Sequence, residues 1–181
     1  YMNPILRLFK SLFKKINYDL KKIKPFNLSE NFPEASEFEK ELLNVCSNYS
    51  MTGHDRMYSL IKSIEFIDQN NVDGDFVECG VWKGGNLIIF QKYVKKLNLN
   101  KKIYAYDTFE GMPKPAEIDK NFEGESASIQ LDKLDKKNVD RKKNILIADC
   151  SLEDVKNNFE KHTFSNNLIC IKGKVENTLK N

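Results

Sequence analysis

The segment from residue 75 to residue 107 constrains the fold more than any other part of the sequence. Residues 75–81 combine a short apolar run with a glycine turn, which is typical of a strand that runs into a loop. Gly84 and Gly85 then open a stretch with apolar residues at helical spacing, and residues 103–107 have the pattern of a second strand. This order predicts two parallel strands joined by a right-handed helical crossover.

An acidic residue lies near the end of each predicted strand, Glu78 in the first and Asp107 in the second. Because parallel strands end at the same edge of a sheet, we expect both carboxylates at a common crevice. A carboxylate beside the glycine loop disfavours a pyrophosphate and favours a positively charged ligand such as S-adenosylmethionine. Asp107 is placed to accept hydrogen bonds from two ribose hydroxyls. Either acid by itself has an alternative role as a helix cap or a surface charge.

Residues 108–113 form a compact turn directly after Asp107. Phe109 or Met112 is expected to supply an apolar wall of an adenosine pocket. The alternative is a plain turn with two core side chains, and the segment alone does not decide between them.

The remaining predicted elements surround this unit. They are a helix over 37–47, a helix with its apolar stripe over 57–67, a long charged loop or flap with a short helix over 114–144, a strand over 145–148, a helix ending at residue 161, and a third strand over 168–172. Thr52 with Asp55, and Ser151 with Asp154, are expected to cap the helices that follow them.

The charge of the chain, +3 overall, is unevenly distributed. Residues 1–24 carry +6, and their apolar side chains recur at helical spacing, which predicts a basic amphipathic leader helix. Such a helix lies on an anionic membrane surface or, alternatively, caps its own domain or a partner subunit. Residues 25–48 are interpreted as a linker and short helix, and 49–181 as the folded domain. The mildly acidic remainder argues against a nucleic-acid-binding protein.

The residues that commonly bind metals are scattered along the sequence. The four cysteines and two histidines are Cys46, Cys79, Cys150, Cys170, His54 and His162. They form no pair with the spacing of a zinc site, so no metal ligand is assigned. We expect reduced, mostly buried thiols and a cytoplasmic protein, since no secretory signal is visible.

Four blocks of the sequence resemble the macrocin O-methyltransferase family of the TylF/MycF type. They are MTGHDRM at 51–57, VECGVWKGG at 77–85, YDTFEGMP at 106–113 and GKVENTL at 173–179. The resemblance covers residues 49–181, with the blocks in the family's order and spacing.

This resemblance implies a Rossmann-like α/β fold of the class I methyltransferases, with N-terminal helices and about three parallel strands of an incomplete sheet. It implies O-methyl transfer from S-adenosylmethionine to a sugar or other small-molecule hydroxyl, a need for Mg²⁺, and a homo-oligomer at full length. Glu78, Gly80 and the Gly84–Gly85 turn would hold the methionine end, and Asp107 the ribose. The full predicted cofactor set is Met51, Thr52, Glu78, Cys79, Gly80, Gly84, Gly85, Asp107, Thr108 and Phe109.

The family's metal ligands and expected base come after the last matching block, on an Asp-rich strand and an Asp-Asp turn. We therefore assign no catalytic residue here, and expect a chain that is a C-terminally truncated, cofactor-side portion of the fold and inactive alone. Two other functions stay open. One is a nucleotide-binding Rossmann module with a different adenosine cofactor, and the other is a non-catalytic interaction protein.

Overall fold

The computed structural model describes residues 9, 11–14, 25–136, 147–163 and 166–179. The chain divides into two compact units, residues 1–35 and residues 36–181. In the first unit, α2 (Leu28–Asn31) is a short helix that begins where the Asn27 side chain accepts a hydrogen bond from the Ser29 N–H. Most of the predicted basic leader helix over residues 1–24 lies outside the described residues.

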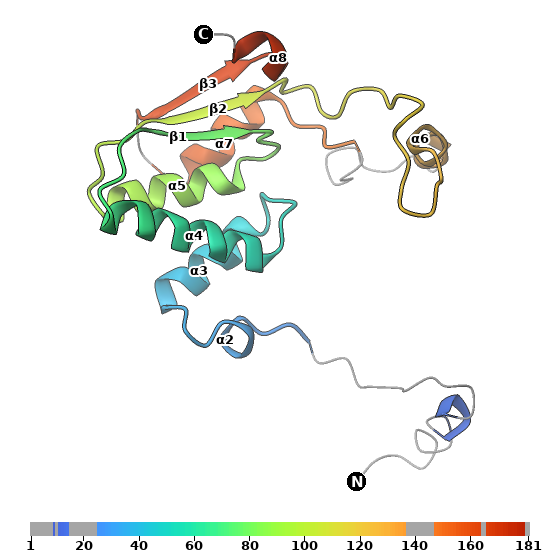
Figure 1. Ribbon diagram of the computed structural model, residues 1–181, viewed down its shortest axis with the longest axis horizontal. Helices are drawn as coiled ribbons and strands as arrows, with labels where there is room; N and C mark the ends of the chain where they lie inside the picture. The colour runs from blue at the N-terminus through green and yellow to red at the C-terminus, as the bar shows by residue number, and fades with distance from the viewer. Residues whose placement is uncertain (1–8, 10, 15–24, 137–146, 164–165, 180–181) are drawn as a thin grey trace. The chain divides into compact units, whose positions relative to one another are not determined.

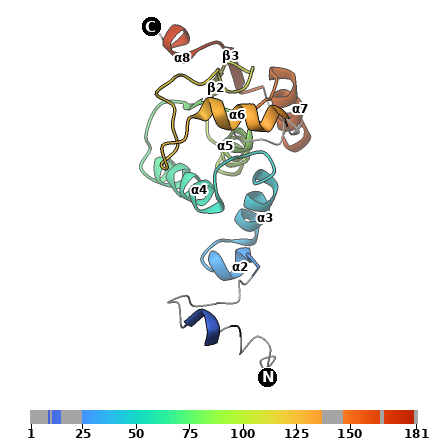
Figure 2. The ribbon, with the colours of Figure 1, turned by 90° about the vertical axis from the view of Figure 1, so that its right-hand side faces the viewer.

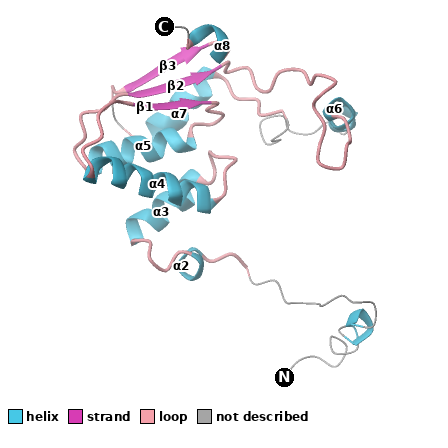
Figure 3. Ribbon diagram, viewed as in Figure 1, coloured by secondary structure: helices cyan, strands magenta, loops and turns pink. Residues whose placement is uncertain are grey.

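The second unit contains a parallel sheet (Figure 1; Figure 3). The described residues form its strands β1 (Phe76–Cys79), β2 (Ile103–Asp107) and β3 (Leu168–Lys172) in the order β1-β2-β3. All three strands agree with the sequence prediction. The register pairs Cys79 with Tyr106 and Asp107 with Lys172, so the carboxyl ends of the three strands meet at one edge. Within the described part of the chain, β1 pairs only with β2.

Most of the helices contact this sheet or each other. They are α3 (Glu37–Cys46), α4 (His54–Gln69), α5 (Gly85–Lys96), α7 (Leu152–His162) and α8 (Val175–Thr178). Helix α6 (Ala127–Lys136) belongs to the charged segment after β2. Figures 1 and 2 both show α4 and α5 on the same side of the sheet. Helix α5 contacts β1 and β2 on one side and α3, α4 and α7 on others, which places it at the centre of the core.

The sequence of α5 explains this central position. Its apolar residues occupy consecutive positions rather than one face, and Leu87, Ile88 and Ile89 are all fully buried. A helical segment with apolar residues at consecutive positions, here 87–90, is stable only when neighbours cover more than one of its faces. The sheet side is covered by β1, where the ring of Phe76 stacks on Phe90 at a centroid distance of 4.8 Å.

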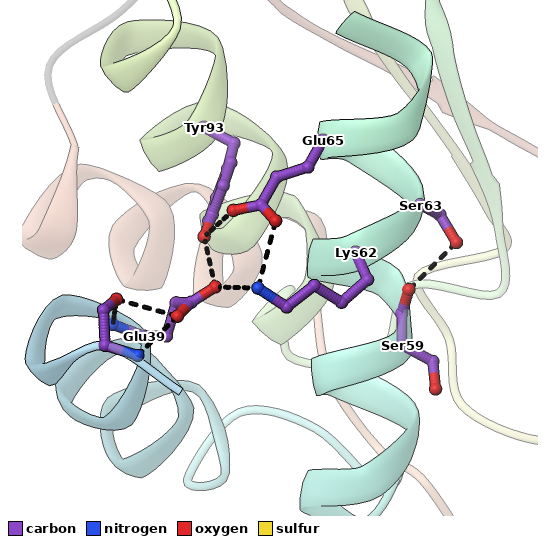
Figure 4. A network of polar contacts seen from close by, with 7 residues as sticks. Glu39, Ser59, Lys62, Ser63, Glu65 and Tyr93 are labelled. Atoms are coloured by element: carbon purple, nitrogen blue, oxygen red, sulfur yellow. Dashed lines mark hydrogen bonds and ion pairs between the residues drawn. The ribbon is translucent and has the colours of Figure 1, made fainter. Parts of the chain in front are cut away.

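A buried polar network joins α3, α4 and α5 (Figure 4). The carboxylate of Glu39, which is 3% exposed, accepts hydrogen bonds from the backbone and hydroxyl of Ser36, from Lys62 Nζ at 2.6 Å and from the Tyr93 hydroxyl at 3.2 Å. Glu65 bonds the same Lys62 and Tyr93 groups. Burial by itself raises the pKa of Glu39, but the hydrogen bonds from Lys62 and Ser36 outweigh it and lower the pKa to about 2.

Two local predictions were wrong. Helix α4 begins after Gly53 with no side-chain cap, because the Thr52 hydroxyl bonds Ser50 instead of the helix. The predicted strand over 145–148 is not formed at its described residues, since Ile147 and Ala148 lie in a turn and a loop. Ala148 has a φ of 51°, which is incompatible with an extended strand.

Other local predictions were confirmed. Ser151 and Asp154 form the expected reciprocal cap at the start of α7. The charged segment contains a short helix, α6, although residues 137–144 of that segment lie outside the described residues. All four cysteines are free thiols, but only Cys46 and Cys150 are buried, so the expectation of mostly buried thiols holds for two of the four. No helix among the described residues is long and apolar enough to span a bilayer.

Candidate functional site

A cavity of about 580 Å³ lies at the carboxyl ends of the strands, where the sequence predicts a crevice. Its lining comes from Met51 before α4, Gly80 and Trp82 after β1, residues 106–108 and 110–113 around the end of β2, Ala148 and Cys150 before α7, and residues 173–176 after β3. Among these described lining residues, Asp107, Glu110 and Glu176 are acidic and only Lys174 is basic. Glu110 is paired with Lys172 at 2.9 Å, so Asp107 and Glu176 leave a small acidic excess over Lys174, which favours a ligand that carries positive charge.

Asp107 holds the two turns that follow β1 and β2. Its Oδ2 atom accepts hydrogen bonds from the N–H groups of Val81 at 2.6 Å and Trp82 at 3.2 Å. Its Oδ1 atom accepts one from the Phe109 N–H at 2.8 Å. The carboxylate is therefore turned toward the backbone of both turns as well as lining the cavity.

Glu78 lies close to Asp107 but does not line the cavity. Its Oε1 atom accepts a hydrogen bond from Asn86 Nδ2 of α5 at 2.8 Å, and its Oε2 atom is buried without a partner among the described residues. Burial raises the pKa of Glu78 to about 7, with a further upward contribution from the charge of Asp107 and a partial offset from the Asn86 bond. A buried carboxyl oxygen without a partner is uncommon in proteins, and it leaves Glu78 able to receive a donor.

The turn after β1 needs its glycines. Gly80 and Gly84 have φ angles of 84° and 88°, a region that favours glycine. At Gly85, a Cβ atom would lie 2.9 Å from the backbone of Tyr49, whose carbonyl accepts the Gly85 N–H. This close approach holds the segment before α4 against the start of α5 and brings Met51 to the cavity.

The turn after β2 is fixed by a second close approach. At Gly111, with a φ of 80°, a Cβ atom would lie 2.7 Å from the carbonyl oxygen of Ile147. That carbonyl accepts the Met112 N–H at 2.8 Å. The contact brings Ala148 and Cys150 beside the β2 turn, although they lie about forty positions further along the sequence.

The structure places only part of the predicted cofactor set on the cavity wall. Met51, Gly80, Asp107 and Thr108 line it, whereas Thr52, Glu78, Cys79, Gly84, Gly85 and Phe109 do not. Phe109 is buried at the start of its turn, and Met112, the other expected wall residue, lines the cavity. Gly84 and Gly85 lie where the turn after β1 runs into α5, and Glu78 accepts a hydrogen bond from Asn86 in the first turn of that helix.

Several lining residues were not proposed from the sequence. Trp82 lies inside the glycine turn that was singled out, so its position was the available signal. Ala148 is the last residue of the segment misassigned as a strand and Cys150 follows it, and no local pattern connects either residue to the β2 turn. Only the tertiary contact at Gly111 reveals them.

The described residues contain no group of three or more His, Cys, Asp or Glu side chains that could hold a metal ion. The magnesium that the family resemblance implies is therefore assigned no ligand in this part of the chain.

Three curated proteins are similar to the chain over part of its length. It is 30% identical over 91 residues to demethyldecarbamoylnovobiocin O-methyltransferase of Streptomyces niveus, covering 46% of this chain and 35% of that protein. It is 33% identical over 66 residues, or 36% of this chain, to 8-demethyl-8-(2,3-dimethoxy-alpha-L-rhamnosyl)-tetracenomycin-C 4'-O-methyltransferase of Streptomyces olivaceus. It is 30% identical over 78 residues, or 42% of this chain, to mycinamicin III 3''-O-methyltransferase of Micromonospora griseorubida. The matches to the last two cover 25% and 31% of those proteins, so the chain corresponds to less than half of each relative.

The solved structure of the O-methyltransferase NovP has the same fold over the matched region. The superposition has a TM-score of 0.54 at 24% identity, and it covers 71% of this chain and 49% of NovP. The parallel sheet with its helices is therefore a Rossmann-like methyltransferase fold.

The family comparison covers more of the chain than any of these pairwise matches. The family described as Macrocin-O-methyltransferase (TylF) matches residues 15–181, a span that includes the three strands and all the residues that line the cavity. The chain belongs to the macrocin-O-methyltransferase (TylF) family.

Proposed function

We propose that the protein carrying this chain is an S-adenosylmethionine-dependent O-methyltransferase that acts on a hydroxyl of a sugar or another small molecule. The observation that carries the proposal is the acid-lined cavity at the carboxyl ends of β1 and β2 in a member of this family. The names of the three relatives all describe O-methyl transfer. They do not favour the alternatives of a different adenosine cofactor or a non-catalytic interaction protein.

Glu78, which lies beside the cavity without lining it, fits the proposed cofactor chemically. S-adenosylmethionine carries an ammonium and a sulfonium, and its bound form supplies an electrophilic methyl group. The unpartnered Oε2 of Glu78 would receive an N–H from the ammonium, directly or through a water molecule. An adjacent cation would also favour the ionised form of this carboxyl, whose pKa is raised to about 7 by burial.

The rest of the predicted set supports the same arrangement. Asp107 and Thr108 would face the ribose, Gly80 and the turn ending at Gly84–Gly85 would let the backbone approach the methionine end, and Met51 with Thr52 would cover the bound molecule. The contribution of this chain to catalysis is then to hold the methyl donor in one orientation and to exclude water from one side of it. No general base is assigned among the described residues.

Binding of the cofactor tests the proposal directly. Calorimetric titration of the chain with S-adenosylmethionine and with S-adenosylhomocysteine should give saturable binding, whereas NAD⁺ should bind far more weakly because its pyrophosphate meets the acidic wall. Glu78→Gln should weaken the binding of both ligands by about tenfold, since a neutral amide replaces the negative charge that would face their ammonium group. Preferential binding of NAD⁺ would contradict the proposal.

Three further expectations belong to this proposal. The absence of disulfides among the four cysteines is compatible with the cytoplasmic location that we propose. Dependence on magnesium is expected from the family resemblance alone, and removal of divalent ions from the whole protein with a chelator tests it. A homo-oligomer, and contact of residues 1–24 with a membrane or a partner, also stay predictions.

A further inference from the structure

We infer that Asp107 is a positioning residue, which joins the turns after β1 and β2 and thereby sets the position of Trp82 at the cavity wall. This role is separate from any hydrogen bond to a ribose. The inference rests on the proposed function only for the identity of the ligand, because the contacts that define it are present in the protein alone.

The hydrogen bonds of Asp107 define this role. The Oδ2 atom accepts the N–H groups of Val81 and Trp82 on the β1 side, while Oδ1 accepts that of Phe109 on the β2 side. Hydrogen bonds to a carboxylate are about twice as strong as those between neutral groups. The two turns that bound the cavity are therefore fastened to each other by a single side chain.

Both turns contain a backbone conformation that needs such support. Trp82 has a φ of 48° and Phe109 a φ of 53°, values that residues with side chains seldom adopt. A non-glycine residue in this region is strained and persists only when its surroundings hold it there. In each turn, the N–H of the residue with positive φ donates to Asp107.

The occupied lone pairs limit what Asp107 can offer to a ligand. Each carboxylate oxygen has about two acceptor sites, and Val81 and Trp82 fill those of Oδ2. On Oδ1, Phe109 takes one site, and the Thr108 hydroxyl lies at the longer distance of 3.4 Å. The sequence-based expectation that Asp107 serves two ribose hydroxyls is therefore replaced by room for one, on Oδ1.

An asparagine in place of Asp107 would conflict with this arrangement. The amide offers one oxygen and one NH₂ group. If its oxygen faces Val81 and Trp82, the NH₂ group points at the Phe109 N–H. In the opposite orientation it points at the two other N–H groups. Asp107→Asn must therefore release one of the turns, while it keeps almost the same size and shape.

Trp82 provides a spectroscopic probe of this role, because it is the only tryptophan in the sequence. In the ligand-free protein, Asp107→Asn should shift the Trp82 emission to longer wavelength and raise its acrylamide quenching constant by about twofold, because the released turn is more open to solvent.

The matched control is Asp75→Asn, which removes a carboxylate that accepts the Lys102 N–H at the opposite end of the same strand pair. The control should keep the wild-type emission and quenching. Unchanged quenching in folded Asp107→Asn would overturn the inference.

If Asp107→Asn does not fold, hydrogen exchange in the unmodified protein tests whether Asp107 joins the two turns. The amide hydrogens of Val81, Trp82 and Phe109 should exchange with solvent about tenfold more slowly than that of Glu110, which donates only to the Thr108 hydroxyl at 3.4 Å. Exchange of these three amides at the rate of Glu110 would contradict a role in fastening the turns.

A pair of ligands separates positioning from ribose recognition. S-adenosylhomocysteine and its 2′,3′-dideoxy analogue differ only in the two ribose hydroxyls. If Asp107 acts through the turns, Asp107→Asn should weaken the dideoxy analogue by about tenfold, and S-adenosylhomocysteine by at least as much, since it can also lose a ribose contact on Oδ1. A loss confined to the hydroxylated ligand would overturn the inference. If the wild-type chain binds neither ligand, the proposed cofactor is wrong, and the fluorescence of Trp82 still decides the role of Asp107.

Discussion

Glu39 is buried, and Glu78 is half-buried with one carboxyl oxygen enclosed, but the surroundings of the two carboxyls differ in almost every other respect. Glu39 lies between helices α3, α4 and α5, where Ser36, Lys62 and Tyr93 donate to its two oxygens (Figure 4). Glu78 lies at the sheet edge, where Asn86 donates to one oxygen and the other has no partner in the part of the chain that the structure describes. The pKa of Glu39 is lowered to about 2, and that of Glu78 is raised to about 7.

The difference between Glu39 and Glu78 shows that the effect of a carboxylate on stability depends on how many donors surround it. A carboxylate whose acceptor sites are filled stabilises the fold in its ionised form. A buried carboxylate whose acceptor sites have no donor lowers the stability of the fold when it ionises. Such carboxylates are common in binding sites, where a ligand supplies the missing donor. The helical layer therefore contributes stability, while the sheet edge keeps unsatisfied groups available for binding.

The largest expected effect comes from removing Glu39. Glu39→Ala deletes the acceptor of Lys62 and Tyr93 and the cap of α3, and should lower the free energy of unfolding by about 3 kcal/mol. This is the lower end of the range for broken buried pairs, because the Lys62 side chain is 43% exposed and can turn to water. Urea denaturation measures the change.

Glu37→Ala is the matched control for that measurement. Glu37 belongs to the same helix and pairs with Lys40 at 2.9 Å, but its side chain is 91% exposed. Surface pairs of this kind contribute less than about 1 kcal/mol. Equal losses for the two variants would mean that burial of Glu39 adds nothing, and the contrast with Glu78 would disappear.

The next effect is a stability that depends on pH with opposite signs for the two carboxyls. The pKa of Glu39 is below the ordinary value of 4.5, so its contribution is complete above that pH and is lost as pH falls toward 2. The pKa of Glu78 is above 4.5, so the folded protein keeps a proton that the unfolded chain releases, and stability falls as pH rises from 4.5 to 7. Together these two groups favour maximum stability near pH 4.5.

Glu78→Gln should remove the fall above pH 4.5 and leave the rise below it intact. At pH 8 the variant should be more stable than the wild type by about 2 kcal/mol, because an ionised buried group is replaced by a neutral one. Unfolding midpoints recorded from pH 3 to pH 8 measure this difference, with Glu160→Gln, an exposed position on α7, as the control. A variant that is less stable than the wild type at pH 8 would show that the Glu78 charge is already compensated.

The two regions also differ in how far the sequence predicts them. Helix and strand periods predicted α3, α4, α5 and all three strands, because these depend on local patterns of burial. The acids at the ends of β1 and β2 followed from the same reasoning, since parallel strands end together. The hydrogen-bond partners of those acids could not be predicted. Their bonds to backbone N–H groups depend on the conformation of a turn, which no local sequence pattern specifies.

Contacts between distant segments were the main source of error and omission. Lys62 lies 23 positions from Glu39, and nothing in either local pattern connects them. The segment before α7 was assigned as a strand from its apolar residues, whereas the approach of Gly111 to Ile147 holds it as part of the cavity wall. Sequence periodicity therefore predicted the framework, and tertiary contacts decided which side chains line the site.

The smallest expected effect comes from removing the hydrogen bond that Glu78 does receive. Asn86→Ala deletes the donor at 2.8 Å, which lowers the pKa of Glu78, so this pKa should rise further above its ordinary value in the variant. The free energy of unfolding should change by less than about 1 kcal/mol, because the Asn86 Oδ1 atom is itself buried without a partner among the described residues, and its removal offsets the lost bond. Carboxyl-carbon NMR titration of Glu78 measures the pKa.

Asn158→Ala is the control, because it removes a donor to the Lys83 carbonyl near the same turn, and it should leave the pKa of Glu78 unchanged. A fall in the pKa of Glu78 on removal of Asn86 would mean that new donors reach the open oxygen, and that the sheet edge can satisfy its carboxylates as the helical layer does.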